Sequence, residues 1–272
     1  MSDTPETTPE PSAKTEAAPV NTAPAKVAPS KGTTTVLAGA ALAVSAVALV
    51  MASLPYFGVG IGPQVRGYLL GNPQILEEMI AARQQAEDQN ITSAIDAAVK
   101  ANPHLLAHDA RDPAVGPENA KVTVIQFFDY RCPGCKAVSV PYREMMARYP
   151  DVRFVFKEWP ILDNGETVTS NYAARAALAA NQQGKFMPVH AALMDERSLS
   201  IEAINQILQE QGVDMAAAQQ AIASADTARH ITDIHTTGVA LGLRGTPTFF
   251  VNGKASASID PADVEQMIKA AQ

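Results

Sequence analysis

The hydrophobic and polar positions along the chain change pattern several times. Residues 1–33 mix proline, threonine, alanine and charged residues and contain no aromatic side chain. Such a segment buries too little apolar surface to offset the entropy of ordering it, so we predict a disordered tail. Residues 34–54 then form a nearly continuous run of valine, leucine, alanine and glycine without a single charge.

This apolar run has the length of a membrane span. As a helix it covers about 31 Å at roughly 1.5 Å per residue, enough for a bilayer core. A cleaved signal peptide and a buried soluble helix remain the alternatives. Against a signal peptide, the run exceeds the usual apolar region of about 7 to 15 residues and follows a long tail with acidic residues. Lys26 and Lys31 precede the run, and Arg66 is the first charge after it. This weak positive-inside bias favours a single-pass anchor with the tail in the cytoplasm.

Residues 59–111 are predicted to form a helical extension. The Pro- and Gly-containing stretch RDPAVGPEN is predicted to link it to the next domain. Val65, Leu69, Leu76 and Met79 recur at helix-like separations, and their apolar stripe needs a cover. We expect either self-association through this stripe or packing of the helices on the domain that follows. That domain, from residue 112 onward, is expected to be complete without the extension.

Residues 112–272 alternate between strand and helix patterns. The β-branched and aromatic run 121–128 predicts a buried strand, 133–149 has helical spacing, and 151–159 predicts a second strand. A strand, helix and strand in this order form a parallel pair, so the fold class is α/β.

The second half of this region returns to strands after a long helical block. Residues 168–243 are rich in alanine and show only helical periodicity, which predicts an inserted helical subdomain. A hairpin with its turn at Asn252 and Gly253 follows, and Asp260 begins a last helix over 261–271.

Composition excludes one large class of partner. The chain is 47% hydrophobic with a net charge of −7 and has no long basic run. It can bury a sizeable core, but it offers no positive surface for a phosphate backbone, so we expect no nucleic-acid partner.

The candidate chemistry lies in FFDYRCPGCK, which holds both cysteines of the chain. A disulfide between Cys132 and Cys135 would close almost no loop and add little stability, so the pair indicates chemistry rather than a structural staple. Cys132 stands where a helix begins, and Pro133 fits a first helical position. The N-terminus of a helix favours a thiolate, which is the attacking form of cysteine. We therefore expect Cys132 to be the exposed nucleophile and Cys135 the shielded resolving thiol.

Metal binding is the competing interpretation of the pair. Structural zinc needs four ligands, and the histidines are scattered without a second paired cluster. Two thiolates suit Cu(I), so a copper-binding envelope protein remains the alternative function. For thiol exchange itself no cofactor is implied.

Taken together, the C-x-x-C at a helix start, the helical block, FKEWPIL and GTPTFFVNG resemble the DsbA-like thiol-disulfide oxidoreductases of the thioredoxin superfamily. The helical extension resembles that of the membrane-anchored ScsC/Com1-like branch. The resemblance implies a thioredoxin fold and the activity of a protein disulfide oxidase or isomerase. It also implies a location in the bacterial inner membrane, with the catalytic domain in the periplasm. The expected clients are unfolded or extended proteins, and a membrane redox partner is expected as well. The direction of electron flow is not encoded in these motifs.

The resemblance also assigns roles to individual residues. Thr246 and Pro247 correspond to the substrate-binding cis-proline site, and Pro133 with Gly134 forms the dipeptide between the cysteines. This dipeptide lacks the histidine of strongly oxidising relatives. Gln126, a further candidate modulator, stands where the family carries a buried acid. Independently of the resemblance, Asp129 and Glu158 lie near the carboxyl ends of the two predicted strands, where they are candidate modulators of the thiols or solvated or capping residues.

Overall fold

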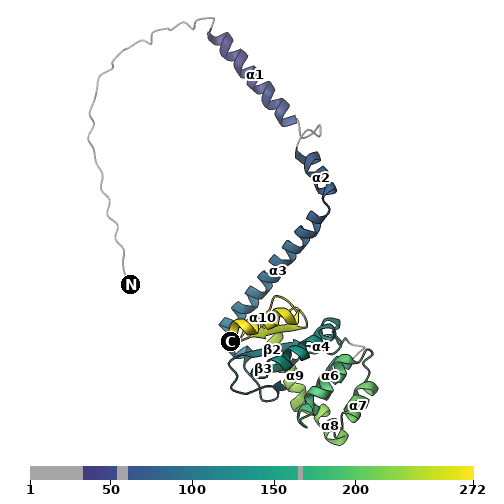
Figure 1. The fold of residues 1–272 in the computed structure, drawn as a ribbon. Coiled ribbons are helices and arrows are strands. Elements are labelled where there is room, and N and C mark those ends of the chain that lie inside the picture. The colour runs from purple at the N-terminus through teal and green to yellow at the C-terminus, as the bar shows by residue number, and fades with distance from the viewer. Residues whose placement is uncertain (1–32, 54–60, 165–167) are drawn as a thin grey trace, which may run out of the picture. The chain divides into compact units, whose positions relative to one another are not determined.

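The computed structural model describes residues 33–53, 61–164 and 168–272, which form two units, Met1–Ile75 and Leu76–Gln272 (Figure 1). In the first unit, α1 (Thr33–Ser53) and α2 (Ile61–Gly71) are helices. The predicted disordered tail lies outside the described residues apart from Thr33. Helix α1 begins one residue before the predicted apolar run of 34–54 and ends at Ser53, where the described range ends. None of the helices within the described ranges is long and apolar enough to cross a bilayer, so the structure does not support the predicted membrane span.

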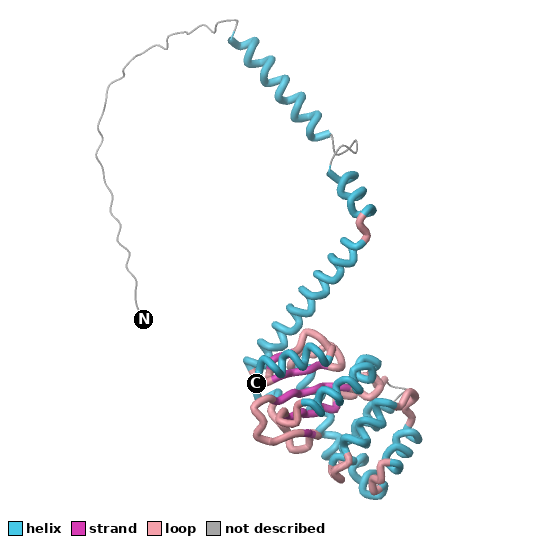
Figure 2. The backbone as a smooth tube through the Cα atoms, viewed as in Figure 1, coloured by secondary structure: helices cyan, strands magenta, loops and turns pink. Residues whose placement is uncertain are grey.

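The second unit is built around a five-stranded mixed sheet with strand order β1-β3-β2-β4-β5 (Figure 2). The central strands β2 and β3 run parallel, as predicted, and β4 pairs antiparallel with β2. Strand β1 lies in the segment that sequence reasoning treated as a link, and it pairs with β3. The strands are β1 (Ala114–Val115), β2 (Thr123–Phe128), β3 (Arg153–Glu158), β4 (Thr248–Val251) and β5 (Lys254–Ala255).

Helices account for the rest of the unit, and five of them separate β3 from β4, where the helical insertion is predicted. Asp260 caps the last helix by accepting a hydrogen bond from the Ala262 amide. The helices are α3 (Gln74–Ala101), the short 3-10 helix η2 (Pro103–Leu106), α4 (Pro133–Arg148), α5 (Thr169–Asn181), α6 (Phe186–Asp195), α7 (Ile201–Glu210), α8 (Met215–Ala223), α9 (Ala225–Ala240) and α10 (Pro261–Ala271).

The two faces of the sheet carry separate hydrophobic cores because side chains alternate along each strand. Val124 and Phe128 of β2 point into the larger core, which includes both cysteines and side chains from α4, α10 and the inserted helices. Ile125 and Phe127 point into the smaller core on the opposite face.

The smaller core includes part of the helical extension, which contradicts the expectation that the domain is complete from residue 112 onward. Ile95 of α3 and Leu106 of η2 are buried in the same cluster as Ile125 and Phe250 of the sheet. Asp96 also accepts a hydrogen bond from the amide of Ala255 in β5 at 2.8 Å. The sheet would expose this apolar face without them, so the end of α3 belongs to the fold of the second unit.

A buried ionic cluster joins the segment before β1 to the sheet and to α9. The carboxylate of Asp112 lies 2.5 Å from the ammonium of Lys157 in β3 and 3.1 Å from Nε2 of His230 in α9, and all three side chains are buried. A buried charge needs such a partner because its desolvation is otherwise uncompensated. Sequence patterns gave no sign of this cluster, since its members are far apart along the chain.

Candidate active site

The cysteines lie where the chain leaves β2 and enters α4. Cys132 is the N-cap of α4 with an extended backbone, Pro133 occupies the first helical turn, and Cys135 follows one turn later. A proline fits here because the first amide of a helix needs no intrahelical partner. The local sequence therefore places the Cys132 sulfur at the positive end of the helix dipole.

The two thiols differ in exposure as predicted, but the difference is smaller than expected. Cys132 is only 7% exposed, so it is buried rather than the exposed thiol that sequence reasoning expected. Cys135 is fully buried at 0% exposure. Both cysteines are free thiols, and of the two only Cys132 keeps any solvent exposure.

The environment separates the acidities of the two thiols. The pKa of Cys132 is lowered from 9.0 to about 5, and the largest cause is the hydrogen bond from Cys135. Hydrogen bonds from the Thr246 side chain and from the amides of Cys135 and Gly134 lower this pKa further, whereas desolvation raises it. Burial raises the pKa of Cys135 far above its usual range, and its bond to Cys132 raises it further. At neutral pH Cys132 is thus a thiolate beside a protonated Cys135.

The loop before β4 completes the site. The peptide bond between Thr246 and Pro247 is cis, as the family resemblance implies. In its thiol form Cys132 donates a hydrogen bond to the Thr246 carbonyl at 3.0 Å. A Cβ added to Gly134 would lie 3.3 Å from Cδ of Pro247 and 3.7 Å from the Cys132 sulfur, so this glycine keeps the dipeptide close to the proline. The structure thus brings all six predicted catalytic and substrate-binding residues together.

Comparison with known proteins assigns this arrangement to a family. Residues 108–270 match the thioredoxin family. The chain belongs to that family. The matched range begins before residue 112 and ends in α10, so it covers the sheet, the cysteine loop and the inserted helices.

Solved structures place the domain beside DsbA-like and ScsC-like proteins, which confirms the predicted resemblance. A thioredoxin-like oxidoreductase from Silicibacter pomeroyi is 33% identical, with a TM-score of 0.57 over 62% of this chain and 97% of that one. A periplasmic thioredoxin-like protein from Salmonella enterica is 25% identical, with a TM-score of 0.54 over 62% and 94%. Proteus mirabilis ScsC carrying a linker deletion is 23% identical and shares the fold, with a TM-score of 0.57 over 78% and 92%.

Curated relatives match slightly more than half of this chain and are much longer proteins. The Na(+)/H(+) antiporter NhaA 3 of Salinispora tropica is 31% identical over 145 residues, which are 53% of this chain and 22% of that protein. NhaA of Herminiimonas arsenicoxydans is 29% identical over 163 residues, or 58% and 25%. The chain therefore spans about a quarter or less of the length of these relatives.

Among the predicted modulators, Asp129 organises the loops of this thioredoxin domain. Its buried carboxylate accepts hydrogen bonds from the amide of Arg131 at 2.7 Å, the hydroxyl of Ser170 at 2.8 Å and the amide of Leu162 at 3.0 Å. These bonds tie the segment after β3 and the start of α5 to the cysteine loop. Asp129 thus has a positioning role that the sequence left open.

Gln126 occupies the sheet position from which the family's acid would face the thiols. It lies on the same face of β2 as Val124 and Phe128, whose core also holds both cysteines. The side chain is buried, and its Oε1 has no hydrogen-bond partner within the described ranges. An amide cannot exchange a proton with a thiol at neutral pH, so Gln126 cannot replace a buried acid.

Glu158, the third modulator, belongs to a buried network that sequence reasoning missed. Tyr130 donates a hydrogen bond from its hydroxyl to Oε1 of Glu158 at 3.0 Å, and Nδ1 of His190 lies 3.0 Å from the same hydroxyl. Burial raises the pKa of Glu158 well above its usual value, and the charges of Asp129 and Asp112 raise it further. The sequence marked Glu158 only by its place near a strand end, and nothing there pointed to His190 as its neighbour.

The buried imidazole of His190 predicts a pH dependence of stability. Burial, with a smaller effect from the charge of Arg143, lowers the pKa of His190 from 6.5 to about 3. The unfolded chain therefore binds a proton more tightly, and stability is lost as pH falls from 6.5 toward 3. When pH falls from about 7 to 5, the unfolding free energy of the wild type should drop by roughly 2 kcal/mol more than that of His190→Gln. Urea denaturation at the two pH values measures both drops.

The exposed His104 in η2 provides the matched control for this measurement. His104→Gln makes the same substitution at an exposed imidazole and shows how much of any change comes from the substitution itself. Glu158 contributes to the pH dependence of stability with the opposite sign, because its pKa is raised in the folded protein. Stability is therefore lost as pH rises above the pKa that Glu158 has in the unfolded chain. Both variants retain Glu158. Identical pH profiles for His190→Gln and the wild type would contradict the assignment.

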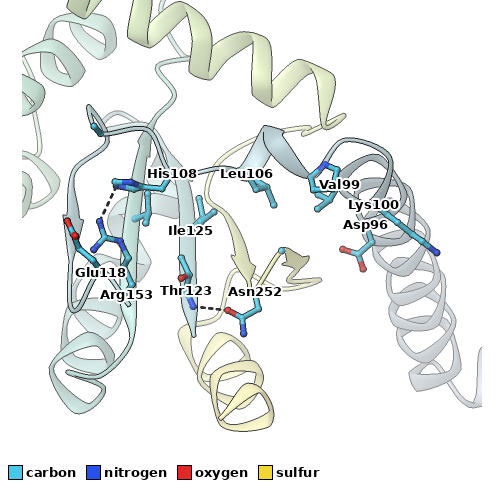
Figure 3. A pocket seen from close by; sticks show the side chains of 14 residues that line it. Asp96, Val99, Lys100, Leu106, His108, Glu118, Thr123, Ile125, Arg153 and Asn252 are labelled. Atoms are coloured by element: carbon cyan, nitrogen blue, oxygen red, sulfur yellow. Dashed lines mark hydrogen bonds between the residues drawn. The ribbon is translucent and has the colours of Figure 1, made fainter. Parts of the chain in front are cut away.

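A spacious cavity lies away from the cysteines. It measures about 1070 Å³ and is lined by the end of α3 and by the amino-terminal starts of β2 and β3, including Val99, Thr123 and Arg153 (Figure 3). The cysteines follow the opposite, carboxyl end of β2. This cavity is therefore not part of the thiol site, despite its size.

The described residues also bear on the metal alternative. They contain no group of three or more histidine, cysteine, aspartate or glutamate side chains that could hold an ion. The copper-binding interpretation therefore rests on the two thiols of Cys132 and Cys135 alone.

Proposed function

We propose that the protein is a thiol-disulfide oxidoreductase acting on protein thiols and disulfides, with Cys132 as its nucleophile. The observation that carries this proposal is the thiolate of Cys132 at the start of α4, beside the Thr246–Pro247 peptide. The Cys132 thiolate attacks a substrate disulfide, so that one substrate sulfur becomes bonded to Cys132 and the other leaves as a thiolate. The number of disulfides is unchanged in this step.

Cys135 then resolves the mixed disulfide. Its thiol loses a proton to solvent and attacks the Cys132 sulfur, which releases the substrate thiolate and leaves a disulfide between Cys132 and Cys135. The substrate is thereby reduced by two electrons and the protein oxidised. The reverse sequence oxidises a substrate dithiol, and release of the first intermediate onto another substrate thiol gives isomerisation.

The backbone of Thr246 supplies the contact for an extended substrate. When Cys132 ionises, it no longer donates to the Thr246 carbonyl, and this acceptor becomes available to a substrate amide. Such a bond is independent of the substrate's side chains, which suits clients that are unfolded or extended proteins. Pro247 and Gly134 flank this position on the side of the cysteine loop.

Equilibration with glutathione tests the proposed function. We expect a reversible change between the dithiol and the Cys132–Cys135 disulfide, with one disulfide formed for each two electrons, and transfer of that disulfide to reduced peptides. The equilibrium position also shows whether oxidation, isomerisation or reduction is favoured. Failure to form the intramolecular disulfide, together with tight Cu(I) binding by the same thiols, would favour the copper alternative instead.

For location, we propose the bacterial envelope, with the catalytic domain in the periplasm and a membrane redox partner that restores its redox state. A similar periplasmic protein from Salmonella enterica supports the compartment. The apolar composition of α1 is the remaining argument for the predicted single-pass anchor. Alkaline extraction of cell membranes distinguishes an anchored protein, which stays in the pellet, from a released one, which appears in the supernatant.

We also propose that the protein associates with itself through the exposed start of α3. Leu76, Met79 and Ile80 are each at least 60% exposed, although they are large apolar side chains at helical spacing. Val65 and Leu69 of α2 are exposed as well. A second copy would cover such side chains and bring several thiol pairs to one client, which raises their effective concentration.

Replacement of all three α3 residues by serine tests self-association. We expect the purified wild-type protein in detergent to be oligomeric by light scattering and the Leu76, Met79 and Ile80→Ser variant to be monomeric. The variant should keep its rate with small disulfides but lose isomerisation of scrambled proteins. A wild-type monomer, or equal molecular masses for the two proteins, would refute the proposal.

A further inference from the structure

The spacious cavity at the end of α3 is lined by a sheet surface that changes from polar to apolar (Figure 3). Thr123 of β2 and Arg153 of β3 are register partners at the start of the two strands. Ile125 and Val155 are the register partners two residues further along, and both line the same cavity. Side chains two positions apart point to one face of a sheet. A polar pair and an apolar pair therefore lie next to each other on one surface.

Side chains outside the sheet extend the apolar part of this lining. Val99 of α3 is half-buried and Pro103 of η2 is exposed, whereas Leu106 is buried in the smaller core with Ile125. The cavity volume of about 1070 Å³ is comparable to the largest small-molecule sites, which measure roughly 300 to 1000 Å³. An aliphatic chain therefore has both space and apolar surface here, and burial of each methylene group favours its binding.

Arg153 contributes a cation without a carboxylate partner. Its guanidinium donates one hydrogen bond to Nε2 of His108 at 3.1 Å, and within residues 33–53, 61–164 and 168–272 it forms no ion pair. Arginine carries five N–H donors, and its planar fork matches the two oxygens of a carboxylate. The Thr123 hydroxyl on the adjacent strand also has no hydrogen-bond partner among the described residues. These two side chains can therefore bind one carboxylate together.

Two polar acceptors of the lining are already used within the protein. Asp96 accepts a hydrogen bond from the backbone of β5, and the side chain of Asn252 accepts one from the backbone of β2 at 2.8 Å. Lys100 of α3 adds a second cation to the lining, and Glu118 adds an exposed acid. Donors and positive charge thus predominate among the lining groups that remain for a ligand, which favours an anion.

We propose that this cavity binds an aliphatic carboxylate, a free fatty acid, with its head group on Arg153 and Thr123. Its tail lies along Val99 and Pro103, above Ile125. The head group gains hydrogen bonds to a charged donor, which are among the stronger ones in proteins. The tail is removed from water by the apolar wall. This binding site is independent of the oxidoreductase function, because the cysteines follow the opposite end of β2.

Photolabelling of the full-length protein tests this site. The probe is dodecanoate with a diazirine in its tail, and its counterpart carries a trimethylammonium head group on the same tail. Mass spectrometry should find the carboxylate probe on peptides from 99–110 and 121–128. Half-maximal labelling should need an at least about tenfold lower concentration of this probe than of the cationic one, in line with the strength of a charged hydrogen bond.

Arg153→Met removes the guanidinium and should raise the half-labelling concentration about tenfold. Arg83→Met makes the same substitution at an exposed arginine of α3 outside the lining and should leave it unchanged. Thr123→Val, a second variant that guards against a folding defect in the first, should raise it as well, and Glu118→Gln should lower it. Equal labelling by the two probes, or equal effects of Arg153→Met and Arg83→Met, would overturn the proposal. Labelling confined to peptides outside the cavity would overturn it too.

Discussion

Cys135→Ser will accumulate as mixed disulfides with unfolded client proteins, and Cys132→Ser will form none. The first variant keeps the attacking thiolate but lacks the thiol that resolves the intermediate. The second lacks the nucleophile, and its remaining thiol is fully buried with a pKa raised by burial. Nonreducing electrophoresis of each variant after incubation with a scrambled protein measures the trapped species. We expect turnover of peptide disulfides to fall by at least about a thousandfold in both variants.

A double Cys132/Cys135→Ser variant provides the control for nonspecific disulfide formation, and it should behave as Cys132→Ser does. Equal trapping by the two single variants would show that either thiol reacts with substrate. Rapid alkylation of Cys135 in the native Cys132→Ser protein would point in the same direction. Both results are incompatible with the burial of Cys135.

Ile95→Ala will strongly destabilise the thioredoxin domain, although the residue lies outside the matched family range. Its side chain is 5% exposed and packs in the core with Ile125 and Phe250 of the sheet. Truncation of a buried isoleucine to alanine costs about 2 to 5 kcal/mol through lost burial and the cavity that remains. Urea denaturation of the wild type and the variant measures the difference in unfolding free energy.

Ile80→Ala gives the matched control, because it makes the same substitution in the same helix at a side chain that is 60% exposed. Its effect on unfolding free energy should stay within about 0.5 kcal/mol when both proteins are compared in the same oligomeric state. Equal losses for the two variants, or no loss for Ile95→Ala, would mean that α3 does not contribute to the domain core.

Local patterns in the sequence predicted most of the fold. The β-branched run before the cysteines became β2, and Asp260 caps the last helix. The thiol site followed from the same logic, since a C-x-x-C at a helix start has few other uses. The cis bond before Pro247 came from family resemblance rather than from local physics.

Long-range packing accounts for what the sequence did not reveal. The sequence left open whether the apolar positions of the helical extension cover a second copy or the following domain, and the structure buries Ile95 but leaves Ile80 exposed. Periodicity identifies an apolar face but not the surface that covers it. Likewise, the contact between Tyr130 and His190 joins residues sixty positions apart, and spacing along the chain holds no information about such pairs. The two-residue strand β1 is too short to show a periodic pattern.

Titration of the Cys132 thiolate tests the central proposal most directly. The ultraviolet absorbance of the thiolate is followed against pH in the wild type and in Cys135→Ser. In the wild type it reports the first ionisation of the thiol pair, and in the variant it reports the ionisation of Cys132 alone. We predict an apparent pKa of about 5 for the wild type and a higher value for the variant, because the hydrogen bond from Cys135 is the largest cause of the shift. A wild-type value near the roughly 8.5 of a free cysteine would contradict the account.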